Sequence, residues 1–335
     1  MSPSLAIALL VGVVGSAGCR SRGEARSSPH VTRILAPADP PLPLDLMPMD
    51  VDRASGRVLC VSYSHGMVEL ERASGGWRVA RRWHPGRELP QGVFGEARYG
   101  IAGAIYLIWL DHGLLKVTGD RASLIDTPGL HGHGPYRVLV RHGGELWIGY
   151  PPLPFGGASN ATVQVLRDER VVRTIALEER ESGTITRWLE VESMDAVVAA
   201  TPAGLVALRS DGSRVRRSSD AVSSIAQDRG TGSLGAAGTV IGRWRGERLE
   251  PVLFGLPAGR SSLHGNPIDL AIDSSGRWYL LYDEGLIARL TPDGRLLDTL
   301  DVADGIPRTA SRLLAHPPTG DVLIGSRDQG MTVAR

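Results

Sequence analysis

A block of two strand-like segments recurs along most of the chain, and this repeat limits what the chain can fold into. In the clearest copy a Pro-Thr-Gly turn leads into the apolar residues 321–325, and a glycine opens a second apolar segment at 330–333. About seven copies recur at intervals of roughly 37 to 51 residues, which brackets the period of β-propeller blades. The first segments of these copies are residues 57–61, 103–107, 144–149, 195–200, 231–235, 277–281 and 321–325.

Each repeat is expected to form one four-stranded sheet. Short apolar runs alternate with Gly, Asp and Pro turns, as in β-strands, and no segment has the 3.6-residue apolar stripe of a helix. One such sheet cannot bury its own faces, whereas a closed ring of sheets can. We therefore predict an all-β fold, a single β-propeller of seven four-stranded blades, with six or eight blades as alternatives. The most degenerate copy pairs residues 231–235 with a Gly-apolar segment at 238–241.

The two ends of the repeat region predict how the ring closes. The final copy leaves no residues for an outermost strand, while residues 31–35 form an isolated strand-like segment ahead of the first copy. An unpaired sheet edge exposes backbone N–H and C=O groups. We expect residues 31–35 to complete the last blade, and the proline-rich residues 37–48 to lead the chain into the first blade.

The N-terminus is typical of an export signal. Residues 5–14 are uninterruptedly apolar, too few to span a bilayer, and are followed by small residues and Cys19. This segment resembles a bacterial lipoprotein signal, which implies lipidation of Cys19; cleavage by an ordinary signal peptidase near Ala17 is the alternative. The expected organisation is a signal peptide at 1–18, a tether at 19–30 and the propeller at 31–335, anchored in the bacterial envelope.

Charge and cysteine content restrict the partners. Lys and Arg total 37 against 36 for Asp and Glu, so no strong field favours nucleic acid. After Cys19 no further segment is apolar and long enough to cross a membrane, so membrane contact is expected through the anchor only. Cys60, in an apolar strand pattern, is expected to be a buried, inert thiol. The propeller is expected to be monomeric.

The repeat also resembles a known family. Residues 144–149 (GELWIG) are similar to the G-x-L-W-I-G strand of two-component-regulator propeller repeats, and residues 304–325 are the most complete copy of that repeat. The resemblance implies a ring of blades and an extracytoplasmic location. It implies no catalytic residues, so a non-catalytic binding or scaffold role for a protein or small ligand is the first hypothesis, without a cofactor.

A channel-centred enzyme is the second hypothesis. His131 and His133 form an H-x-H pair that offers two nitrogens to a metal, although a zinc site needs further ligands. Residues 265–277 resemble a segment of calcium-dependent lactonases, in which an Asn and an Asp bind the metal, and Asn266 and Asp269 match these positions. The early Glu-Gly-Pro motif of that family is missing. A divalent metal and a hydrolase or lyase activity are expected only under this hypothesis.

One loop departs from the repeat. Residues 151–160 (PPLPFGGASN) replace the short turn of the other copies and carry Phe155. Loops that interrupt a repeat commonly form a binding face. Phe155 is therefore a candidate ligand-contacting residue.

Overall fold

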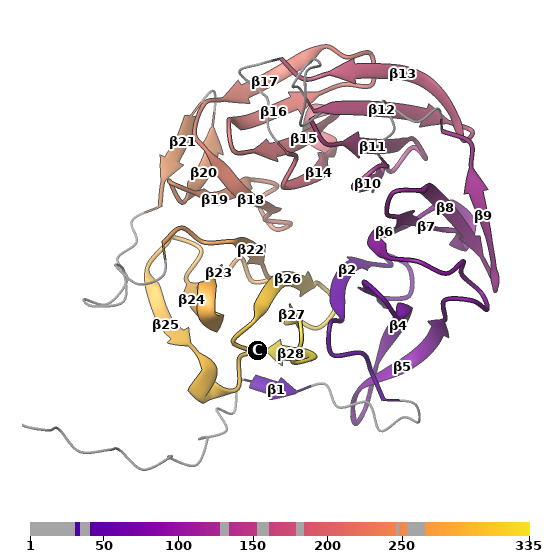
Figure 1. The fold of residues 1–335 in the computed structure, drawn as a ribbon. Coiled ribbons are helices and arrows are strands. Elements are labelled where there is room, and N and C mark those ends of the chain that lie inside the picture. The colour runs from indigo at the N-terminus through magenta and orange to yellow at the C-terminus, as the bar shows by residue number, and fades with distance from the viewer. Residues whose placement is uncertain are drawn as a thin grey trace, which may run out of the picture.

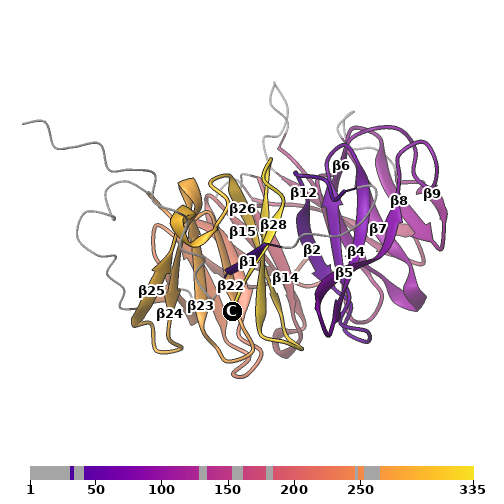
Figure 2. The ribbon, with the colours of Figure 1, turned by 90° about the horizontal axis from the view of Figure 1, so that it is seen from below.

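The chain forms a ring of seven four-stranded antiparallel sheets, a seven-bladed β-propeller, in a computed structural model (Figure 1). The structure describes residues 31–33, 41–127, 134–152, 161–178, 184–245, 248–252 and 265–335. The ribbon colour advances once around the ring, and the side view shows the blades standing next to one another around it (Figure 2).

Each blade presents one strand to the ring axis, and the remaining strands follow outward in chain order, except that the N-terminal strand β1 is the outermost strand of the last blade. The innermost strands are β2 (Met47–Val51), β6 (Phe94–Tyr99), β10 (Arg137–Val140), β14 (Arg187–Val191), β18 (Val222–Gln227), β22 (Asp269–Ile272) and β26 (Ala310–His316). The second strands are β3 (Val58–Ser62), β7 (Ile105–Trp109), β11 (Leu146–Tyr150), β15 (Ala196–Thr201), β19 (Leu234–Gly238), β23 (Trp278–Tyr282) and β27 (Asp321–Ser326). The third are β4 (Gly66–Ala73), β8 (Gly113–Thr118), β12 (Thr162–Arg167), β16 (Gly204–Leu208), β20 (Gly242–Arg245), β24 (Leu286–Leu290) and β28 (Met331–Ala334). The outer strands are β5 (Gly76–Trp83), β9 (Arg121–Ile125), β13 (Arg170–Ala176), β17 (Arg214–Ser218), β21 (Arg248–Pro251), β25 (Leu296–Leu300) and β1 (Val31–Arg33).

Apolar side chains on both faces of the blades hold the ring together. Each of the seven seams between neighbouring blades contains its own buried apolar cluster. The second and third strands are largely buried on both faces, and every residue of β3, β15, β23 and β24 is buried. This explains why they appear in the sequence as continuous apolar runs, whereas the outer strands are half exposed.

Strand β1 closes the ring, which confirms the closure predicted from the sequence. It pairs antiparallel with β28, with Val31 opposite Ala334 and Thr32 opposite Val333. In Figure 1 this strand lies beside β28 at the outer edge of the last blade. The described strand ends at Arg33, two residues before the predicted boundary, and residues 34–40 lie outside the described part of the chain.

A polar contact reinforces the seam between the first and last blades. The buried carboxylate of Asp321 on β27 accepts a hydrogen bond of 3.1 Å from Nε1 of Trp77 on β5. Nε of Arg335 lies 3.0 Å from the other oxygen of the same carboxylate. The closing seam therefore combines a strand ladder, an apolar cluster and a buried carboxylate.

The most degenerate repeat departs from the expectation in one detail. Residues 239–241 do not belong to a strand; they form the turn between β19 and β20, and the third strand of that blade begins at Gly242. Ala236 of β19 lies opposite Gly242, which places the intervening residues in the connection. The run Gly-Thr-Val-Ile is apolar enough to resemble a strand, but the hairpin register makes it a turn.

No helix among the described residues is long and apolar enough to cross a membrane.

Candidate functional site: the central channel

The innermost strands surround a chamber on the ring axis, at the end where these strands finish. Its volume is about 440 Å³, and all seven blades contribute to its wall. Apolar side chains such as Leu139, Leu189 and Ile225 share this wall with arginines and carboxylates. A mixed apolar and polar lining of this size is typical of a small-ligand site.

Irregular pairing in the inner strands directs polar side chains toward the channel. The pairing register shifts within β2, β6, β18 and β26. These shifts lie immediately before Asp50, Ser224 and Arg312, and within β6 around Glu96. Because a bulge adds one residue to a strand, it changes the direction in which the neighbouring side chains point. Polar residues thus reach the axis from strands that are otherwise apolar.

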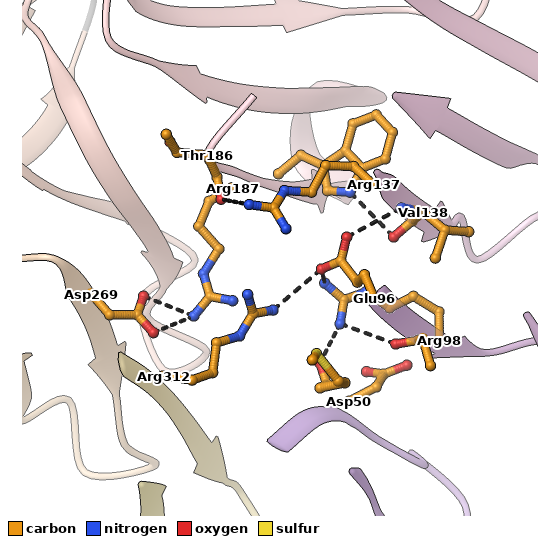
Figure 3. A network of polar contacts seen from close by, with 12 residues as sticks. Asp50, Glu96, Arg98, Arg137, Val138, Thr186, Arg187, Asp269 and Arg312 are labelled. Atoms are coloured by element: carbon orange, nitrogen blue, oxygen red, sulfur yellow. Dashed lines mark hydrogen bonds and ion pairs between the residues drawn. The ribbon is translucent and has the colours of Figure 1, made fainter. Parts of the chain in front are cut away.

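Seven charged residues form what we call the belt, a network of polar contacts that includes ion pairs across the channel (Figure 3). The belt consists of Asp50, Glu96, Arg98, Arg137, Arg187, Asp269 and Arg312.

One half of the belt is centred on Asp269. Nη2 of Arg187 lies 2.7 Å and 2.6 Å from the two carboxylate oxygens of Asp269. The hydroxyl of Ser224 and the backbone N–H groups of Leu270 and Leu313 also donate to this carboxylate. The side chain of Asp269 is only 4% exposed. A carboxylate buried to this degree needs such donors, since burial without them would be costly.

The other half is centred on Glu96, whose side chain is 2% exposed. One oxygen accepts from Arg98 at 2.5 Å and from Arg312 at 3.2 Å, and the second accepts from the backbone N–H of Val138 at 3.1 Å. Figure 3 places the Arg312 guanidinium between Glu96 and Arg187. Arg312 on the seventh blade thereby reaches a carboxylate on the second blade, across the channel.

Asp50 lies beside these pairs and has an altered acidity. Its two oxygens accept hydrogen bonds of 2.9 Å from the backbone N–H groups of Val51 and Tyr99. Burial raises the pKa of Asp50, and the opposing effects of Arg98 and the two hydrogen bonds do not cancel this shift. The ionised form of Asp50 is thereby less favoured than that of an ordinary carboxylate.

Further charged residues form the rim of the chamber. Nη1 of Arg53 in the first blade lies 3.1 Å from Oε1 of Glu192, which follows β14 in the fourth blade. This exposed ion pair spans the mouth. Arg141 contacts Glu145, Glu190 and Asp195 at 3.3, 3.0 and 2.7 Å, and its guanidinium is fully occupied by these carboxylates.

Several guanidinium N–H groups that face the chamber lack a hydrogen-bond partner among the described residues. Nε of Arg312 is buried and has none. Arg187 uses only Nη2 in its contacts with Asp269 and Leu313. Arg229 lines the chamber at the rim and makes no hydrogen bond or ion pair within the described ranges; desolvation and repulsion from Arg53 lower its pKa. Arginine carries five donors and no acceptor, so the chamber offers donors.

Two residues predicted as metal ligands lie in the described part of the chain. Asp269 faces the channel, but both of its oxygens are bound by Arg187 and other donors, an arrangement that favours a structural role. Asn266 is exposed, three residues ahead of β22. In the ranges that the structure describes, no three His, Cys, Asp or Glu side chains are grouped as a metal site.

The remaining predicted site residues are not placed. Cys19, His131, His133 and Phe155 lie outside the described residues. Cys60 is fully buried on β3, as predicted, and desolvation raises the pKa of its thiol.

The arginines of the belt were missed by the sequence analysis. Each lies in a different repeat, and no local motif connects them. A usable signal was present: innermost strands such as FGEARY, RWLEV and ASRLLAH interrupt an apolar pattern with charged residues, and charges in a buried strand indicate a shared polar site.

Comparison with known proteins supports the fold. No family model matches the chain, and no curated protein matches it either. The structure is similar to a catalytically inactive variant of virginiamycin B lyase from Staphylococcus aureus crystallised with quinupristin, with a TM-score of 0.58 and 11% identity over 90% of this chain and 98% of that chain. It is equally similar to the WD40 β-propeller domain of Doa1, with a TM-score of 0.58 and 13% identity over 87% of this chain and 93% of that one. At such identities these similarities concern the fold alone, and the chain is a seven-bladed β-propeller.

Proposed function

We propose that this protein is an envelope-anchored, non-catalytic binding module that takes up a small ligand in the channel chamber. The observation that carries the proposal is the chamber itself, about 440 Å³ in volume and lined by all seven blades. A site built from seven inner strands is held by the whole ring, and such rigidity lowers the cost of ordering on binding.

The belt supports a binding role over the metal-dependent alternative. Asp269, the residue that would hold a metal in a lactonase-like channel, is neutralised by Arg187 at 2.6 Å. A metal ion would have to displace this guanidinium and several hydrogen-bond donors. Binding a ligand against the free side of the belt requires no such rearrangement.

Anchoring is the second part of the proposal. The apolar residues 5–14 and the small residues before Cys19 support lipidation of that cysteine. Strand β1 begins at Val31, at the outer edge of the last blade. A tether of about 12 residues can extend to roughly 40 Å, which would hold the ring close to a membrane surface.

The chamber can be tested by obstruction. Gln227, the last residue of β18, is half-buried and lines the chamber, so Gln227→Trp would fill part of it. Leu297→Trp on the outer strand β25 is the control, because Leu297 is 50% exposed and lies far out in the same ring. Small molecules that raise the melting temperature of the purified chain would be identified first, and their affinity measured by calorimetry.

We expect one molecule per chain to bind, with affinity reduced at least about tenfold by Gln227→Trp and unchanged by Leu297→Trp. Equal affinity in the chamber variant and the control would place the ligand elsewhere and contradict the proposal. A screen in which no compound binds the unaltered chain would also contradict it.

A further inference from the structure

The hydrogen-bonding capacity of the chamber indicates what kind of ligand it takes. Every carboxylate of the belt already has donors on its oxygens: Asp50 has two backbone N–H groups, Glu96 has two arginines and Val138, and Asp269 has Arg187 and Ser224. These carboxylates have little left to offer a cation or a donor.

The carboxylates at the rim are occupied in the same way. Glu190 accepts from Arg141 at 3.0 Å and from the backbone N–H of His142 at 2.7 Å. Asp273 accepts from Ser275 and Arg277 in its own turn. These carboxylates at the chamber are therefore satisfied by the protein.

The donors are not satisfied. The buried Nε of Arg312 and the Nε and Nη1 atoms of Arg187 have no partner in the described part of the chain, and Arg229 has none for its whole guanidinium. The buried Nε of Arg312 costs about 1 to 3 kcal/mol of desolvation while it lacks a partner, so an acceptor is expected to meet it. The exposed guanidinium of Arg229 and the remaining donors of Arg187 are open to the same acceptor. Nη2 of Arg187 also donates to the backbone oxygen of Leu313, the residue next to Arg312, so the positive charges of Arg187 and Arg312 lie close together on this wall and favour an anion beside them.

We propose that the chamber binds a small organic anion, a carboxylate or phosphate attached to an apolar or sugar-sized body. Arg187 and Arg312 would hold the anionic group from the inner strands, and Arg229 would hold it from the rim. Planar guanidinium groups match both carboxylates and phosphates, with two parallel hydrogen bonds. The apolar wall formed by Leu139, Leu189 and Ile225 would contact the body of the ligand. This inference rests on the proposed function, because it assigns a ligand class to the same chamber.

The test uses pairs of probes that differ only in charge: succinate against succinamide, and glucose 6-phosphate against glucose. Binding of each to the purified chain would be measured by calorimetry at low and at high salt. We expect at least one anion to bind and its neutral partner to bind at least about tenfold more weakly, with affinity falling as salt rises. The two pairs separate carboxylate from phosphate as the recognised group.

The variants then locate the site. Arg229→Gln removes an exposed side chain that makes no hydrogen bond or ion pair with the described residues, so the fold should stay intact, and it should weaken the anion by at least about tenfold. Arg312→Gln should weaken it further, provided that its thermal unfolding resembles that of the unaltered chain. Arg295→Gln is the control, since Arg295 pairs only with exposed Asp293 outside the chamber.

The outcomes distinguish the inference from the proposed function. A neutral or cationic ligand that is lost in Gln227→Trp but unaffected by Arg229→Gln would overturn the anion inference and leave the chamber in place as a binding site. Failure of every anionic probe to bind would overturn the inference too. Loss of all binding, including that of the initial screen, would overturn both.

Discussion

Arg187 on the fourth blade and Asp269 on the sixth form an ion pair of 2.6 Å that crosses the channel past the fifth blade. Both side chains are largely buried, at 12% and 4% exposure. The fifth blade joins the same contact through Ser224, whose hydroxyl lies 2.6 Å from Asp269. Polar contacts on the axis thus connect blades that the apolar seams do not.

The first prediction concerns this pair. Asp269→Ala leaves the Arg187 charge buried without its partner, and we expect the free energy of unfolding to fall by about 3 to 5 kcal/mol. Asp120→Ala is the control, because Asp120 is 75% exposed in its pair with Arg81 and its removal should have no measurable effect. Urea denaturation of both variants measures the difference. Equal stabilities would show that the cross-channel pair has no structural role.

Ring closure gives the second prediction. Deleting residues 31–35 removes the β1 ladder and the packing of Val31 against the last blade, so the melting temperature should drop by several degrees, or the protein should aggregate. Deleting residues 20–28, most of the tether, should leave thermal unfolding unchanged. If both deletions were equally harmless, the closing strand would be dispensable.

The third prediction is a pH dependence. Burial raises the pKa of Asp50, so the native state keeps this proton where the unfolded chain, with an ordinary aspartate pKa near 4, has released it. The native state then binds more protons than the unfolded state, and stability falls as pH rises through that window. Asp50→Asn should therefore become increasingly stable relative to the unaltered chain from pH 4 to pH 7, by about 1.4 kcal/mol per unit of pKa shift.

Asp273 provides a control of opposite sign. Burial alone would raise the pKa of Asp273, but hydrogen bonds from Ser275 and Arg277 outweigh this effect and lower the pKa. Its contribution to stability is present above the ordinary aspartate pKa and is lost as pH falls through the lowered value. Asp273→Asn should lose stability at pH 7 relative to the unaltered chain. Urea midpoints at several pH values test both variants. If the stability of both variants relative to the unaltered chain changed with pH in the same way, the assignment would be refuted.

The fourth prediction uses Cys60 as a reporter. Its side chain is fully buried, and the raised pKa keeps the thiol protonated and unreactive. A thiol reagent should label Cys60 only as the ring unfolds, with complete labelling in guanidinium chloride. Rapid labelling under native conditions would mean that the seam between the first and last blades opens locally.

The fifth prediction concerns Cys19. Lipidation there predicts that Cys19→Ser is released from the membrane fraction or accumulates as an unprocessed precursor. Cys60→Ser is the matched control, because its cysteine is buried in the ring and its loss should not alter fractionation. Normal processing and membrane association of the Cys19→Ser protein would exclude the anchor.

The architecture was predictable from the sequence because it depends on local patterns. The run Trp278–Tyr282 is a buried strand, and a turn precedes it, just as its composition predicts. The isolated segment at Val31 was recognisable as the missing outer strand, since the last repeat had no chain left to supply one. The strand pattern depends on neighbouring residues, and the missing outer strand follows from counting the strands in the last repeat.

The channel was not predictable in the same way. Glu96 and Arg312 make contact at 3.2 Å, yet they lie on the second and seventh blades. Which side chains meet on the axis depends on the closure of the whole ring and on bulges that shift the direction of single residues within inner strands. Neither property leaves a local motif, and Asp269 therefore resembled a metal ligand when considered within its own segment.

The pairing of β1 with β28 has a consequence for the order of synthesis. The two strands are about 300 residues apart, so β1, the first strand of the ring to be made, has no partner until β28, the last strand, has been made. A chain interrupted after an earlier blade leaves β1 without its partner and exposes the apolar faces of its two end blades, which favour aggregation. Loss of Met331–Ala334 would be more damaging than loss of Val31–Arg33, because β28 is buried and pairs with both β1 and β27, whereas β1 pairs with β28 alone. If the chain is exported as proposed, completion of the ring must also wait until translocation is almost finished.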